Sequence, residues 1–119
     1  MQYKNLSFRQ RLGFALQGIR QAWKAEKSLR FQSLAALGLF VFCAVVRPPL
    51  VWCALFAAMA AMVLALELVN SAVEAILDRL HPERNASIGF AKDCLAGAAL
   101  VASLASVLVF ALYLWSAVF

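Results

Sequence analysis

Residues 50–66 form an unbroken apolar run, and a segment carrying three carboxylates follows directly, with no proline or glycine before residue 78. Wound as an α-helix, the apolar run would be about 25 Å long, which approaches the thickness of a bilayer's hydrocarbon core. The pattern therefore predicts one continuous helix over 50–78 that starts in an apolar medium and ends in water. Such a helix favours a membrane bundle over a soluble fold.

The composition agrees with a membrane protein. Of the 119 residues, 65% are hydrophobic and only 14% are charged, whereas soluble domains average roughly half apolar and about a quarter charged. Three isolated cysteines show no metal-ligand spacing and indicate no disulfide framework. The net charge of +5 comes from cations near the apolar segments rather than from a separate basic domain, so we expect no nucleic-acid partner.

Hydrophobic periodicity and helix-breaking residues divide the chain into four helical segments. We expect an all-α membrane protein with one integral membrane domain over 1–119, built from an N-terminal amphipathic surface helix and three transmembrane helices. The surface helix is predicted at 7–27, and the spans at 29–46, 50–78 and 91–115. Two consecutive prolines separate the first two spans, since proline cannot continue a helix.

The surface helix carries one residue that departs from its pattern. Phe8 and Ile19 lie on its apolar side, and most cations lie opposite, as in a helix at a membrane interface. Glu26 falls at nearly the same helical angle as Phe8 and Ile19. Either Glu26 is a carboxylate facing the bundle, or it lies at a helix end where the angle has no meaning.

The distribution of cations predicts the orientation in the membrane. Most of the eleven Lys and Arg residues precede the first span or lie between residues 79 and 92, and none follows residue 92. Cytoplasmic loops carry the excess of positive charge. We therefore expect the N-terminus and the 79–93 loop on the cytoplasmic side, and the C-terminus on the periplasmic or external side.

The carboxylates after the apolar run share one helix face. At about 100° per residue, Glu67, Asn70, Ser71, Glu74 and Asp78 fall within about 100° of one another. Acids at membrane depth are functional-site candidates by default. The first is expected near the edge of the hydrocarbon, and Glu74 about 10 Å nearer to water. A base at Glu67 could thus meet a lipid alcohol while Glu74 meets a hydrated cation.

Magnesium suits this arrangement because it binds through one or two carboxylates and phosphate oxygens while keeping several waters. Glu26 could supply a second carboxylate at the same membrane level. Lys92 and Asp93 open the third span on the cytoplasmic side, where a lysine can neutralise phosphate charge. No GxxxxGK[ST] loop is present, so a nucleotide would be held without one.

Two motifs carry a resemblance to a known family. The segment Glu67-x-x-Asn70-Ser71-Ala72-Val73-Glu74-x-x-Leu77-Asp78, followed by Ala91-Lys92-Asp93-x-x-Ala96-Gly97-Ala98, resembles the prokaryotic diacylglycerol kinases. The likeness extends over almost the whole chain and includes Gly18-Ile19-Arg20-Gln21-Ala22-Trp23 before Glu26. It implies an inner-membrane homotrimer that transfers the γ-phosphate of MgATP to a lipid alcohol, which we expect to be diacylglycerol, with phosphatidic acid as the product. Because so short a chain encloses little by itself, we also expect sites shared between neighbouring chains.

The resemblance also implies roles for individual residues. Catalysis would involve Glu67 as the base and Asn70. Magnesium would be held by Glu26 and Glu74. The nucleotide and its metal would be bound by Phe14, Glu26, Glu74, Glu83, Arg84, Asn85, Lys92 and Asp93. The lipid would be bound by Arg20, Trp23, Glu67, Ala96 and Trp115.

Other functions stay open at this stage. Gln32 stands where Gram-negative members of the family carry a carboxylate, and Glu26-Lys27-x-x-Arg30 is similar to Gram-positive members that prefer undecaprenol. Undecaprenol is therefore the alternative substrate. An alternative of another class is a non-enzymatic membrane subunit, which would use its acids to conduct protons or to dock a partner, or a structural adaptor.

Overall fold

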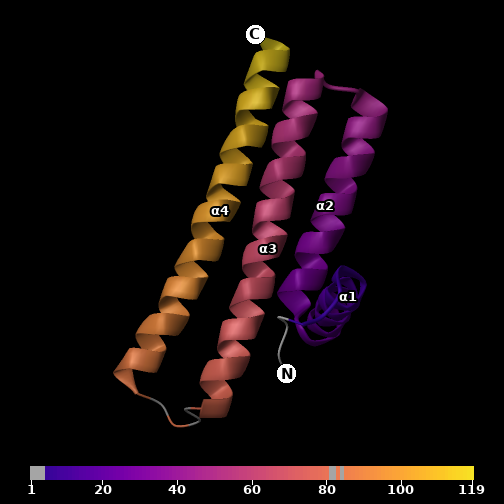
Figure 1. The fold of residues 1–119 in the computed structure, drawn as a ribbon. Helices are drawn as coiled ribbons and strands as arrows, with labels where there is room; N and C mark the ends of the chain where they lie inside the picture. Colours follow the sequence, from indigo (N-terminus) through magenta and orange to yellow (C-terminus); the bar gives the residue numbers. More distant parts are fainter. Residues whose placement is uncertain (1–4, 81–82, 84) are drawn as a thin grey trace.

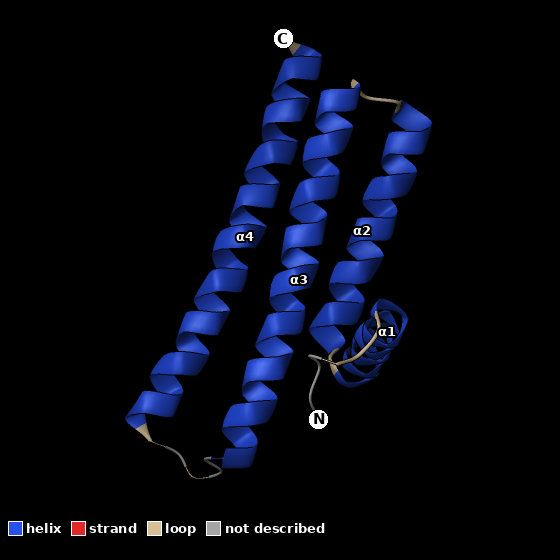
Figure 2. Ribbon diagram, viewed as in Figure 1, coloured by secondary structure: helices blue, strands red, loops and turns tan. Residues whose placement is uncertain are grey.

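The computed structural model describes residues 5–80, 83 and 85–119, and every regular element in this part of the chain is a helix (Figure 2). The three long helices run side by side, and the shorter first helix crosses the end of the bundle where α2 begins (Figure 1). The helices are α1 (Phe8–Ala25), α2 (Lys27–Val46), α3 (Leu50–Leu80) and α4 (Ala86–Val118).

The first helix is fixed at both of its ends. At the start, Ser7 and Gln10 form a capping box in which each side chain bonds to the other's backbone. At the end, the Arg30 guanidinium donates to the carbonyl oxygens of Trp23 and Lys24, at 2.9 and 2.7 Å. Those carbonyls have no partner within the helix. Arg30 therefore ties the last turn of α1 to the first turn of α2.

The surface helix ends at Ala25 rather than at residue 27, because the backbone of Glu26 is extended (φ −108°, ψ 113°). Glu26 is at once the last cap of α1 and the first cap of α2. A single residue thus forms the elbow between the two helices. The half-buried side chain of Glu26 is placed by this elbow and not by a helical angle.

The prolines end α2 as the sequence predicts. Arg47 adopts a left-handed conformation (φ 56°) before Pro48, and this conformation is uncommon outside glycine. The Pro49 carbonyl then accepts hydrogen bonds from the N–H groups of Trp52 and Cys53, at 2.9 and 3.2 Å. These bonds satisfy donors in the first turn of α3, so that helix starts immediately.

The helix α4 begins at Ala86 rather than at residue 91. Asn85 is its cap, because its Oδ1 accepts the N–H of Ile88 at 2.9 Å. Gly89, which the sequence reading placed in the loop, lies inside the helix. A glycine inside a helix costs only about 1 kcal/mol relative to alanine, so the cap and the following apolar run set the boundary. The helices α3 and α4 also extend to Leu80 and Val118, beyond the predicted 78 and 115.

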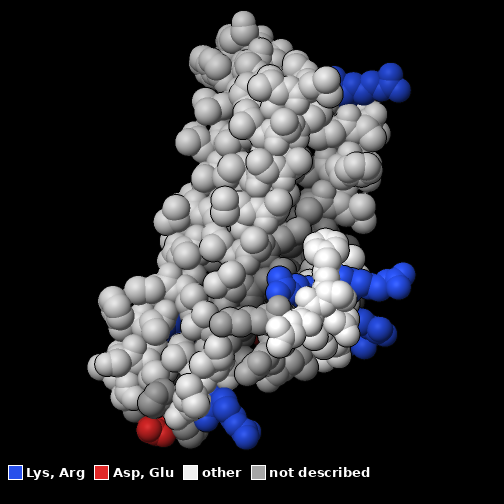
Figure 3. All heavy atoms as spheres, viewed as in Figure 1, with Lys and Arg blue, Asp and Glu red and all other residues white. Residues whose placement is uncertain are grey.

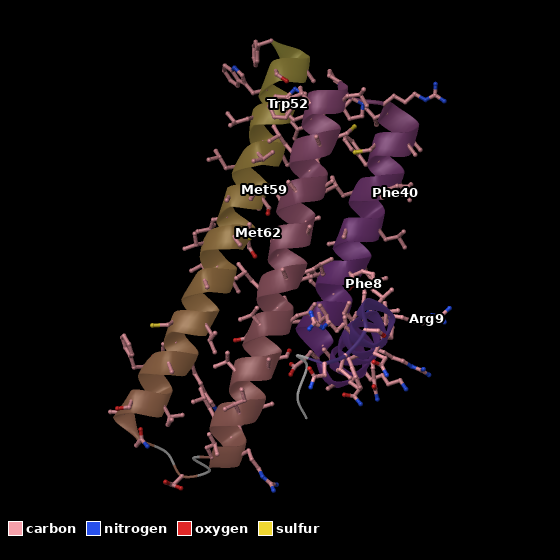
Figure 4. All side chains as sticks on the ribbon, viewed as in Figure 1. Phe8, Arg9, Phe40, Trp52, Met59 and Met62 are labelled. Atoms are coloured by element: carbon pink, nitrogen blue, oxygen red, sulfur yellow. The ribbon has the colours of Figure 1, made fainter. Side chains whose placement is uncertain are left out.

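The central helix is α3, which packs against both α2 and α4. Near the turn between α2 and α3, five rings from three helices form what we call the aromatic cluster, with centroids 5.5–6.4 Å apart. Trp52 lies at this end of the bundle (Figure 4). Among its members, Phe56 and Tyr113 are buried. The cluster consists of Phe42, Trp52, Phe56, Phe110 and Tyr113.

The outside of the bundle is apolar. By length and composition, α2, α3 and α4 are each able to cross a membrane, and large side chains such as Phe40 and Leu50 are exposed on them. Lys and Arg side chains gather around α1 and the nearby end of the bundle, and one cation stands at the opposite end (Figure 3). The predicted architecture of a shorter first helix and three long apolar helices is confirmed.

Candidate functional site

The polar face of α3 runs from the interior of the bundle to its surface. Glu67 is only 8% exposed and is the one charged residue among the buried side chains of the described chain. Asn70, Ser71 and Glu74 are half-buried, and Asp78 is exposed. Exposure therefore rises along the face in the direction that the sequence predicts.

The start of this face contacts α2. The Ser28 hydroxyl donates to Oε2 of Glu67 at 2.9 Å, in a partly buried hydrogen bond. A buried carboxylate is unfavourable unless it is hydrogen-bonded or paired. Ser28 supplies that partner from the first turn of α2. Within the described residues, no buried side-chain oxygen or nitrogen lacks a hydrogen-bond partner.

The end of the face contacts α4. The Lys92 ammonium lies 2.8 Å from a carboxylate oxygen of Asp78, and the two side chains are 39% and 64% exposed. An ion pair this exposed contributes little stability. It does place the Lys92 charge beside the polar face of α3. The same face is thus joined to α2 at the buried end and to α4 at the exposed end.

A groove of about 600 Å³ lies between α1 and α3. Glu26 and Ser71 both line it, so the elbow carboxylate and the polar face of α3 border one space. Most of its other lining residues are small, which leaves the groove open. Those small residues are Ala15, Gly18, Ala22, Ala25, Ala72 and Ala75.

Two half-buried carboxylates, of which Glu26 lines this groove, are the kind of donor that suits a hard cation. Glu26 and Glu74 are both half-buried carboxylates, and Glu74 follows Glu67 by two turns on the same face of α3. In the part of the chain that the structure describes, no three His, Cys, Asp or Glu side chains form a ready metal cluster. Magnesium does not require one, since one or two carboxylates suffice when phosphate oxygens and waters complete the shell.

The other predicted nucleotide residues lie on α1 and around the α3–α4 connection. Phe14 is half-buried on α1, and Glu83 and Asp93 are exposed. Oδ1 of Asn85 accepts the N–H of Ile88 as the cap of α4, so one of the two lone pairs of this oxygen is already used. Arg84 lies outside the described residues.

The predicted lipid residues are not all brought together. The Arg30 guanidinium lies over the Trp23 ring, 6.0 Å from its centroid, and Arg20 is exposed on the same helix. Ala96 is exposed one turn after Lys92. Trp115, 65% exposed, is near the other end of α4, about 34 Å along the helix from Lys92. Within one chain, Trp115 therefore lies far from the acids.

The sequence reading did not identify Ser28 or the role of Arg30. A weak signal for Ser28 existed, because Ser28 and Glu67 lie at the same end of two antiparallel helices and hence at similar depth. The pairing itself depends on how α2 and α3 are rotated against each other, which no single-helix pattern reports.

Comparisons with known proteins agree with this geometry. Residues 13–114 match the family model described as prokaryotic diacylglycerol kinase. The chain is 31% identical over 104 residues to the diacylglycerol kinase of Escherichia coli (strain K12), covering 87% of this chain and 85% of that protein. It is 35% identical over 80 residues to the diacylglycerol kinase of Haemophilus influenzae, covering 67% and 68% of the two chains.

A diacylglycerol kinase of Synechocystis is more distant, at 28% identity over 97 residues, which cover 81% of this chain and 55% of that protein. The family match includes the polar face of α3, the elbow at Glu26 and the first turns of α4. The chain belongs to the prokaryotic diacylglycerol kinase family.

Proposed function

We propose that this protein transfers the γ-phosphate of MgATP to diacylglycerol at the cytoplasmic face of a bacterial inner membrane, giving phosphatidic acid and ADP. The observation that carries the proposal is the buried Glu67 carboxylate, which is held by Ser28 and directly follows the apolar run of α3. It provides a base at the depth of a lipid hydroxyl. The polar face beyond it reaches the water in which the nucleotide is dissolved.

In the proposed reaction, the lipid hydroxyl oxygen attacks the γ-phosphorus, and the bond from that phosphorus to the β–γ bridging oxygen breaks. The hydroxyl proton passes to Glu67, and the electron pair of the broken bond leaves with ADP. Asn70, half-buried on the same face, orients the reacting groups by hydrogen bonding. Lys92 offsets the negative charge of the phosphates.

Magnesium would be held by Glu26 and Glu74, and when bound it would neutralise phosphate charge. Phe14, Glu83, Arg84, Asn85 and Asp93 are proposed to contact the nucleotide. Arg20, Trp23, Ala96 and Trp115 are proposed to contact the lipid. The half-buried state of Glu26 and its place on the groove support its role.

We further propose that the protein works as a homotrimer with sites shared between neighbouring chains. A Cβ added at Gly97 of α4 would meet nothing within 4 Å, and alanines flank this glycine in the sequence, which would let another helix approach closely. The proposed topology has the N-terminus in the cytoplasm and the C-terminus in the periplasm or outside.

The test is to supply purified protein with MgATP and one lipid alcohol at a time in mixed micelles. Diacylglycerol should yield phosphatidic acid, and turnover should exceed that with undecaprenol. A preference for undecaprenol would support the kinase activity and would contradict diacylglycerol as its substrate. ATP use that ignores lipid, or proton flux in liposomes without lipid-dependent ATP use, would contradict the proposed function.

A further inference from the structure

The hydrogen bond from Ser28 to Glu67 joins residues far apart in the chain. Oγ of Ser28 lies 2.9 Å from Oε2 of Glu67, across the contact between α2 and α3. A hydrogen bond to an ionised acceptor is roughly twice as strong as one between neutral groups. Ser28 is therefore in a position to hold one of the two carboxylate oxygens.

The orientation of a glutamate carboxyl group is otherwise weakly determined. Rotation about its last torsion is broad and roughly two-fold, so the side chain alone does not fix the plane of its oxygens. A donor on Oε2 removes that freedom. The other oxygen, Oε1, is then left in one direction to take up a proton.

We propose that Ser28 is a positioning residue for the base, fixing Oε2 of Glu67 so that Oε1 faces the lipid hydroxyl. This inference rests on the proposed kinase function and assigns Ser28 a role in that same site. Ser28 closely follows Glu26 at the elbow. The first turn of α2 thus sets the position of the base and of a proposed magnesium ligand together.

The first test compares two substitutions at Ser28 with a matched control on the same helix. Ser28→Ala removes the hydroxyl, and its kcat should fall about tenfold, while KM for lipid and for MgATP changes by less than about twofold. Ser28→Thr keeps the hydroxyl and should recover most of the rate. In Ser33→Ala the lost hydroxyl donates to the Leu29 carbonyl of its own helix, so kcat should stay at the wild-type value.

A second test asks whether Ser28 acts through Glu67. In Glu67→Asp the carboxylate is drawn back by one methylene and loses its reach to Ser28. Adding Ser28→Ala to Glu67→Asp should then change the residual kcat by less than about twofold. A full tenfold loss in that background would overturn the inference, since Ser28 would be acting on something else.

The outcomes at Ser28 are distinct from those of the kinase proposal. An unchanged kcat in Ser28→Ala, an equal loss in Ser28→Thr, or a change confined to KM for lipid would each overturn the positioning role while wild type remains a kinase. A wild type that phosphorylates no lipid alcohol would overturn both. Thermal unfolding of Ser28→Ala, Glu67→Ala and the double variant would then still show whether the two side chains are coupled.

Discussion

The two ends of the helical bundle differ in how their helices are joined. At the end near the prolines, the aromatic cluster joins α2, α3 and α4 through many ring contacts. At the opposite end, α3 meets α2 through the hydrogen bond of Ser28 to Glu67 and meets α4 through the ion pair of Lys92 with Asp78. A cluster with many ring contacts retains most of them when one is lost, whereas a single polar contact is not replaced when it is lost. From this comparison we expect stability to be concentrated at the first end, while the proposed site lies at the second.

The largest expected effect is at the polar end. Glu67→Gln keeps the size of the side chain and an acceptor for Ser28, but it removes the group that takes up the proton. Turnover should fall at least about a thousandfold, while the thermal unfolding temperature in detergent stays near that of wild type. A variant that phosphorylates lipid at the normal rate would show that Glu67 is not the base.

Glu74→Gln should distinguish the role of a metal-binding carboxylate from the role of the base. We expect turnover at low Mg²⁺ to fall about a hundredfold, because one charged ligand is lost. Raising the Mg²⁺ concentration should restore part of the rate in Glu74→Gln and none in Glu67→Gln. Activity measured over a range of Mg²⁺ concentrations decides this, and equal responses of the two variants would remove Glu74 from the metal site.

Phe56→Ala tests the aromatic end. Lipid is as apolar as the ring, so the loss of packing and the cavity left behind determine the cost, which we expect to be about 2 kcal/mol. Thermal unfolding in detergent should show the loss, and turnover per folded molecule should be unchanged. Phe40→Ala is the matched control, because Phe40 is exposed and points away from the bundle (Figure 4), and its unfolding should match wild type.

The smallest effect is expected for Asp78→Asn. Both partners of its ion pair are more than one-third exposed, so the pair should contribute less than about 1 kcal/mol, and less at high salt. Unfolding measured at low and at high salt should differ between wild type and variant only at low salt. A loss several times larger would mean that polar contacts at this end stabilise the fold as strongly as the rings do.

Much of the fold was predictable from the sequence because it depends on local features. Apolar runs defined the spans, the prolines defined the turn, and helical spacing placed Glu67 and Asp78 on one face. The start of α4 was predicted at residue 91 and lies at Ala86, because the Asn85 cap determines the boundary and Gly89 continues the helix. A local sequence pattern treats a cap and a glycine as separate signals. The position of a helix end depends on the sum of their contributions to the free energy of the helix.

The site was predictable only in part. The polar face of α3 could be predicted, since charges at membrane depth are unusual, but the ion pair of Asp78 with Lys92 was not predicted. Ser28 could not, because a hydroxyl near a helix start has many ordinary roles and its partner depends on the rotation of two helices. Trp115 lies near the end of α4 that is far from the acids of α3. A site that contained both would therefore need a neighbouring chain.

The one-residue elbow at Glu26 has a mechanical consequence. The helix α1 has the pattern of an interfacial helix, which stays in the plane of the membrane surface, while a spanning helix tilts when the bilayer becomes thinner or thicker. No flexible linker separates the two helices, and Arg30 is hydrogen-bonded to the end of α1. A change in the tilt of α2 must therefore change the backbone conformation around Glu26. Bilayer thickness would thereby act on the same turn that carries Ser28 and so on the geometry of the proposed site.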